Sequence, residues 1–154
     1  MNTAIRPDRK ALEDSPEYFW ERFSQYAQTW PVSPEPLGSP MLEVLTPMGP
    51  LFAFDRGLVP CSKSEIQLIL HGQVEHWEPT QHTQALTHLG AGRYQMTGQV
   101  EAVLDEVFFV LQVQGDDNGP LQVLLSAPTP PAVGSRVTVR LRPPLMAFRL
   151  DGSR

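Results

Sequence analysis

The sequence predicts an all-β protein: a small, bent antiparallel barrel or sandwich with one N-terminal amphipathic helix. After residue 40, apolar and polar residues alternate in several short runs, which is the two-residue period of β-strands. Apolar residues recur at helical spacing only over residues 15–30. The chain has 154 residues, of which 41% are hydrophobic, so it can bury a core without disulfides. Its single cysteine, Cys61, can form none within the chain.

The residues before the β domain fall into three segments. We expect residues 1–14 to form a mobile N-terminus, because they are polar and show no periodicity. Residues 15–30 are a predicted helical arm, with Ser15 as N-cap and Pro16 at the first helical position. Its aromatic stripe consists of Phe19, Phe23, Tyr26 and Trp30. Residues 31–40 contain four prolines and are a predicted stiff linker.

The β domain is predicted to span residues 41–150. Its expected strands cover residues 41–46, 51–54, 65–77, 93–104, 106–114, 121–127, 136–142 and 145–150. Residues 80–92 are polar and are expected to form a loop or a short helical turn. Gly98 lies in the middle of the apolar face of its strand, which predicts a sharp bend there.

From residue 93 onward the order of strands resembles the OB fold, a five-stranded barrel with a long, bent first strand. The resemblance covers residues 93–150 and rests on the pattern of strands, because no family motif is matched. Residues 128–134 leave no room for the helix usual in that fold. OB folds often bind oligonucleotides or oligosaccharides, so the resemblance implies a binding function.

Arginines line one side of the predicted strand 136–142. Three aliphatic residues face the core by the period of two: Val137, Val139 and Leu141. Guanidinium groups pair well with phosphates and carboxylates, so the opposite side predicts an anion-binding site. The candidate residues are Arg136, Thr138, Arg140, Arg142 and Arg149. A second interpretation stays open, in which the arginines only solvate the strand and block edge pairing.

Two functions follow as hypotheses. The first is a non-enzymatic binding module that holds single-stranded nucleic acid or another polyanion on the arginine-lined strand. The net charge of −5 argues against a general nucleic-acid binder, so the arginines would have to act locally. The second is a structural or interaction subunit that docks on a partner protein, or on a second copy, through its aromatic helix. We expect docking in trans because of the stiff linker, although docking on its own barrel stays open.

We predict no enzymatic activity, no cofactor and no bound metal. The sequence has no Gly-rich phosphate loop and no nucleophile elbow. Its histidines fall in one short window but match no metal motif; they are His71, His76, His82 and His88. Residues 1–10 lack the apolar region of a signal peptide, and no apolar run approaches a membrane span of about 20 residues. We therefore expect a cytoplasmic protein without membrane contact.

Overall fold

The computed structural model describes residues 15–33, 40–57, 61, 63–81, 85–90, 92–114 and 120–149. One α-helix, α2 (Pro16–Phe23), runs into a 3-10 turn, η1 (Ser24–Tyr26). The strands are β1 (Gln28–Ser33), β2 (Met41–Thr46), β3 (Gly49–Asp55), β4 (Glu65–Pro79), β5 (Ala85–Gly90), β6 (Arg93–Val103), β7 (Phe108–Gln114), β8 (Pro120–Ser126) and β9 (Arg136–Arg149). The predicted all-β fold with one N-terminal helix is confirmed.

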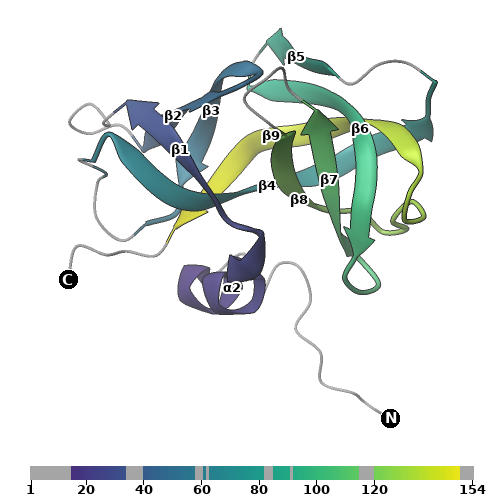
Figure 1. Cartoon of the computed structure of the whole chain (residues 1–154), viewed down its shortest axis with the longest axis horizontal. Helices are drawn as coiled ribbons and strands as arrows, with labels where there is room; N and C mark the ends of the chain where they lie inside the picture. The colour runs from purple at the N-terminus through teal and green to yellow at the C-terminus, as the bar shows by residue number, and fades with distance from the viewer. Residues whose placement is uncertain are drawn as a thin grey trace.

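The strands close into two rings that share β4 and β9. The first ring runs β4–β8–β7–β6–β9, and β9 pairs back onto β4. The second ring runs β1–β2–β3–β9–β4, and β4 pairs back onto β1. In Figure 1 the two shared strands cross the middle of the molecule, with β1, β2 and β3 on one side and β6, β7 and β8 on the other. The fold is thus a ring of hydrogen-bonded strands, extended by a second ring.

Two strand contacts, β3 with β9 and β4 with β8, are parallel, so the sheet is mixed rather than wholly antiparallel. The predicted loop at 80–92 also contains a strand, β5, which pairs with β6. Each parallel contact involves one of the shared strands, β9 or β4, and joins residues far apart in the sequence, where local pattern carries little information. The pairing of β5 with β6, by contrast, is a local hairpin in which Ala85 lies opposite Thr97.

The expected strands 136–142 and 145–150 are one continuous strand, β9. Along one edge β9 pairs with β6 over residues 136–140 and with β3 over residues 146–147. Pro143 and Pro144, joined by a cis peptide bond, occupy the stretch of this edge that lies between the two partners. Proline lacks a backbone N–H, so it is tolerated where no ladder hydrogen bond is required. The expected break at the prolines is therefore wrong, because the strand continues through them.

The OB-like segment supplies four strands of the first ring rather than five. It was expected to supply all five strands of a ring from residues 93–150, and it supplies β6, β7, β8 and β9. The remaining position, between β8 and β9, is taken by β4, which comes from residues 65–79. The ring is therefore built from a longer part of the chain than the resemblance covers.

A continuous apolar core fills both rings. It includes Leu42 and Leu51 from the second ring and Val100 and Leu111 from the first, all at most 1% exposed. A smaller core lies between the N-terminal helix and the outer side of the sheet; its buried members are Phe19, Phe23, Ile69, Phe108, Val110, Leu124, Met146 and Phe148. The helix therefore completes the packing of the sheet.

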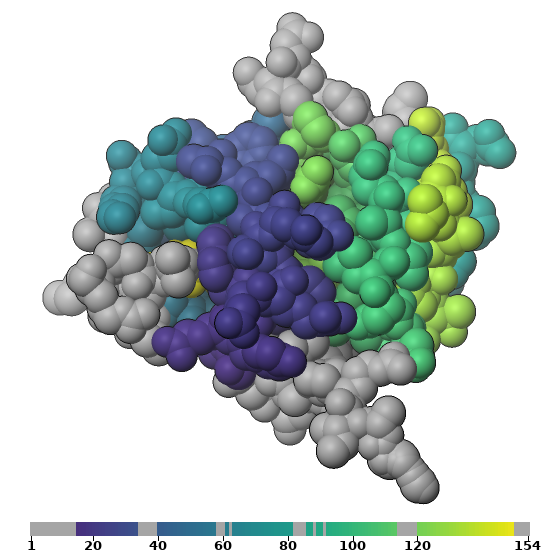
Figure 2. Space-filling model, turned by 60° about the horizontal axis from the view of Figure 1, so that its bottom comes forward, coloured from purple at the N-terminus to yellow at the C-terminus, as the bar shows by residue number. Residues whose placement is uncertain are grey.

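The helical arm docks on its own chain. The ring of Phe19 stacks on that of Phe148 with centroids 3.9 Å apart, and the ring of Phe23 lies 4.9 Å from that of Phe108. Figure 2 brings this side forward and shows the purple N-terminal segment against the green strands. The expectation of docking in trans is therefore wrong for this structure: burying large apolar side chains on a nearby surface needs no second chain.

An ion pair fixes the arm to the loop between β6 and β7. Arg22 donates a hydrogen bond to Asp105 at 3.1 Å, and the backbone N–H groups of Val107 and Phe108 also donate to this carboxylate. Partial burial alone would raise the pKa of Asp105, but these hydrogen bonds outweigh it and lower the pKa below its ordinary value. The charged form of Asp105 thus stabilises the docked arm above the ordinary pKa, and this contribution is lost as the pH falls through the lowered value.

The helix is shorter than the predicted arm. It ends at Phe23, and the chain from Gln28 to Ser33 forms β1 instead of continuing the helix and entering the linker. Trp30 therefore lies in a strand opposite Ile66, where it packs against the larger core. The rest of the predicted linker, residues 34–39, lies outside the described residues, as does the N-terminus 1–14.

We predict that Phe19→Ala destabilises the protein by about 3–5 kcal/mol, the usual cost of deleting a buried Phe ring. Tyr18, on the same helix, is 43% exposed, and Tyr18→Ala should change the free energy of unfolding by no more than about 0.5 kcal/mol. Urea denaturation of both variants measures the difference. Equal small losses would show that the arm is not packed on the sheet in solution.

Gly98 provides a test of ring closure. A Cβ at this position would collide with the backbone carbonyl oxygen of Gln112 in β7. The glycine is needed for this close approach of strands rather than for an unusual backbone angle. We expect Gly98→Ala to cost about 1–3 kcal/mol in urea denaturation, as overpacking does. Glu101→Ala, at an exposed position of the same strand, is the control, and equal stability of both variants would contradict the close approach.

Candidate functional site

The outer side of β9 carries the predicted arginine row. Its members, here called the arginine face, are Arg136, Thr138, Arg140 and Arg142. The three arginines are exposed and Thr138 is half-buried, while the residues between them are at most 1% exposed. The predicted alternation over this strand is confirmed. Alternate residues of a strand lie about 6.6–6.8 Å apart, so the face presents an evenly spaced row of polar groups.

On one side of the arginine face lies β6, which adds neutral polar side chains. Gln95 pairs with Arg140, and Gln99 pairs with Arg136. Between them, the hydroxyls of Thr97 and Thr138 are hydrogen-bonded at 2.8 Å. Amide and hydroxyl groups both donate and accept hydrogen bonds, so this flank can contact either charged or neutral parts of a ligand.

On the other side, β4 brings acidic and imidazole groups. His76 pairs with Arg140, and Glu78 pairs with Thr138. The imidazole of His76 lies 3.8 Å from the carboxylate of Glu78, and both side chains are exposed. The β4 flank is therefore less favourable for an anion than the β6 flank.

The arginines keep their charge available. Glu75 of β4 accepts a hydrogen bond at 3.2 Å from Arg93 of β6. Since β4 and β6 lie on opposite edges of β9, this ion pair reaches across β9. This pair neutralises a carboxylate that would otherwise compete for the arginine face. Within the described residues, no ion pair joins Arg136, Arg140 or Arg142 to an acid.

Two cavities adjoin this face. A polar cleft of about 530 Å³ is lined by Glu78, Pro79, Thr80, Gln81, Gln95 and Thr138. An apolar pocket of about 520 Å³ is lined by Met41, Phe52, Gly92, Tyr94, Pro143, Pro144 and Leu145. Both volumes lie in the range of small-ligand sites.

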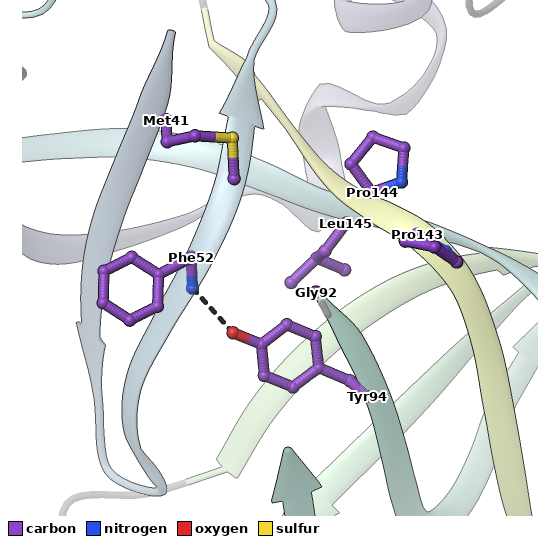
Figure 3. Close-up of a pocket in the computed structure, with 7 residues that line it drawn as sticks. All are labelled: Met41, Phe52, Gly92, Tyr94, Pro143, Pro144 and Leu145. Atoms are coloured by element: carbon purple, nitrogen blue, oxygen red, sulfur yellow. Dashed lines mark hydrogen bonds between the residues drawn. The ribbon is translucent and has the colours of Figure 1, made fainter. Parts of the chain in front are cut away.

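The apolar pocket, here called the inter-ring pocket, follows from the double-ring architecture. It lies where β9 leaves its partner β6 and has not yet reached β3, so the two rings diverge. Figure 3 shows Met41 and Phe52 on the hairpin of the second ring and Tyr94 and Gly92 at the start of β6, with the proline elbow of β9 beside them. The hydroxyl of Tyr94 accepts a hydrogen bond from the backbone N–H of Phe52 at 2.9 Å, which joins the two rings across the pocket.

Arg149 does not belong to the arginine face. Its guanidinium donates two hydrogen bonds of 2.9 Å to the two carboxylate oxygens of Asp55 on β3. Both side chains are buried, and the Asp55 carboxylate also accepts from the backbone N–H of Gly57. Burial of a charge requires such pairing, so Arg149 joins β9 to β3. The structure therefore does not place Arg149 with the other predicted arginines, which are exposed.

The four predicted partner-binding residues are used within the chain. Phe19 and Phe23 are at most 2% exposed in the smaller core. Tyr26 packs against that core, and Trp30 packs against the larger one. The helix side that faces away from the sheet offers Tyr18 as its exposed aromatic residue among those described.

The histidines are separated. His71 is fully buried, with Nδ1 2.8 Å from the carbonyl oxygen of Leu124 and its ring near Phe19 and Phe108. His76 is exposed farther along β4, beside Glu78. His82 and the side chain of His88 lie outside the described part of the chain. Among the described residues no group of three or more His, Cys, Asp or Glu side chains could hold a metal ion.

The inter-ring pocket was not predicted from the sequence. Its lining comes from four separate strands, so no local pattern could bring Phe52 and Leu145 together. Phe52 and Met41 carried a weak signal, since both fall on the outer side of their strands, where a polar residue is the norm.

In the described part of the chain, none of the helices has the length and apolar character needed to cross a membrane. Comparisons of the chain with protein-family models, with curated proteins and with solved structures find no match.

Proposed function

We propose that this chain is a non-enzymatic binding module for single-stranded nucleic acid. The observation that carries the proposal is the arginine face: Arg136, Arg140 and Arg142 are exposed, regularly spaced and joined to no acid within the described residues. Phosphates along a nucleic-acid backbone also recur at regular intervals, and arginine binds them with two parallel hydrogen bonds.

The surroundings support a single strand over a duplex. A row of charges on one strand, flanked by the amides and hydroxyls of β6, suits a flexible chain that follows the sheet. A duplex is usually read by a helix or ribbon that enters a groove, and the only described α-helix, α2, is packed on the sheet. Glu78 on the β4 flank would repel phosphate, so the strand is expected to follow β9 on the side of β6.

The OB-like resemblance adds to this proposal. β6, β7, β8 and β9 form part of a closed ring, as the resemblance implies, and OB folds often bind oligonucleotides. The resemblance supports a binding function in general, whereas the arginine face supports an anionic ligand such as nucleic acid. The second hypothesis, docking on a partner through the aromatic helix, gains no support from the structure because its main side chains are buried within the chain.

The test is a titration of a fluorescein-labelled 12-nucleotide oligothymidylate, followed by anisotropy at several salt concentrations. We expect binding that weakens as salt rises, with a slope that falls by about 2 in the variant Arg136→Gln/Arg140→Gln/Arg142→Gln, because each lost phosphate contact on a single strand contributes about 0.7.

Arg22→Gln is the control, since Arg22 is an exposed arginine on the arm and away from the arginine face. Arg22→Gln should leave the salt dependence of the affinity unchanged. Each single substitution in the arginine face should weaken oligothymidylate binding more than Arg22→Gln does. Wild-type protein that binds no oligothymidylate at low salt would overturn the proposal. Heparin, as a polyanion without bases, shows whether binding extends to polyanions in general.

A further inference from the structure

The inter-ring pocket lies directly beside the arginine face. Arg142 is followed in the chain by Pro143 and Pro144, which line the pocket. On β6, Tyr94 of the pocket is followed by Gln95, which pairs with Arg140. Arg142 is the last residue of the arginine face, so a ligand that lies along this face reaches the pocket just beyond Arg142.

The pocket has an exposed apolar rim and a buried floor. Phe52 and Met41 on the hairpin are 44% and 36% exposed, although both are large apolar side chains. Tyr94 and Leu145 below them are at most 2% exposed. Exposed apolar side chains around a cavity are typical of a binding site, and proline and aromatic rings offer flat surfaces to a planar ligand.

We propose that the inter-ring pocket binds one nucleobase of the single strand whose phosphates lie on the arginine face. The inference rests on the proposed function. Charge complementarity selects this occupant: a chain that places anionic groups at Arg140 and Arg142 brings the next planar group over Phe52 and the proline elbow. The other apolar ligands that could enter carry no such row of anions.

The pocket predicts weak discrimination among bases. Among the described residues its lining is apolar apart from the Tyr94 hydroxyl and backbone groups, and that hydroxyl already accepts the hydrogen bond from Phe52. Stacking and apolar contact are available to every base, whereas selection of one base needs placed hydrogen-bonding groups. The pocket thus adds affinity for any base-bearing strand.

The experiment compares two 12-mers of equal charge by anisotropy: oligothymidylate and an abasic deoxyribose-phosphate chain. Stacking on aromatic side chains is worth about 1–3 kcal/mol per base, so wild type should prefer oligothymidylate by about tenfold. Phe52→Ala should remove most of this preference and leave abasic binding unchanged. Leu45→Ala is the matched control, because Leu45 is 41% exposed on the same hairpin but does not line the pocket, and it should leave both affinities unchanged.

A second measurement locates the base. In protein labelled with ¹³C-methyl methionine, the Met41 methyl signal should shift when oligothymidylate is added and stay in place with the abasic chain. Met96 and Met146, in the two cores, serve as internal references. Equal affinity of wild type for the two 12-mers, or a Met41 signal that does not respond to bases, would overturn the pocket proposal while leaving the arginine face intact. Binding of neither 12-mer would overturn both proposals.

Discussion

The pairing of β4 with β9 is the constraint on which the rest of this structure depends. Their ladder runs from Leu68 opposite Arg149 to Pro79 opposite Val137, and both rings close on it. A strand pair this long must bend to serve two rings, and it does so at irregularities between His71 and Gln73 and between Val74 and His76. Such bulges increase local twist and re-aim a strand. Without them, one pair could not form the edge of two separate rings.

The candidate site is a consequence of the same pairing. One edge of β9 exchanges β6 for β3 along its length, and the inter-ring pocket lies where that exchange happens. The Asp55–Arg149 pair holds β3 on β9 at one end of this region, and the hydrogen bond from Phe52 to Tyr94 holds the hairpin against β6. These contacts between rings keep the pocket and the arginine face in fixed relation, which a multi-contact ligand requires.

The sequence was informative wherever the burial of side chains follows a local period. The alternation in 136–142 predicted which residues of β9 are buried and placed Arg136, Arg140 and Arg142 outside. Arg149 was included although it has the parity of the core-facing residues Leu145 and Ala147. Its burial follows that parity, and the pairing with the distant carboxylate of Asp55 makes the burial of the charge possible.

Features that depend on long-range pairing were also missed. The sequence placed Trp30 on the helix because its spacing fits, yet the ladder with β4 recruits this residue into a strand, an example of tertiary context overriding local propensity. The proline pair indicated a break, although an unpaired edge tolerates it within one strand. The inter-ring pocket needs four strands to be placed at once, and only the exposed Phe52 and Met41 hinted at it.

Native-state hydrogen exchange shows whether the shared pair of strands makes the two rings one cooperative unit. We expect slowly exchanging amides of the second ring, such as Val44, and of the first ring, such as Val110 and Val123, to open with the same free energy as global unfolding, because neither ring persists without β4 and β9. A second ring whose amides open at a free energy several kcal/mol lower, while the first ring stays protected, would contradict it.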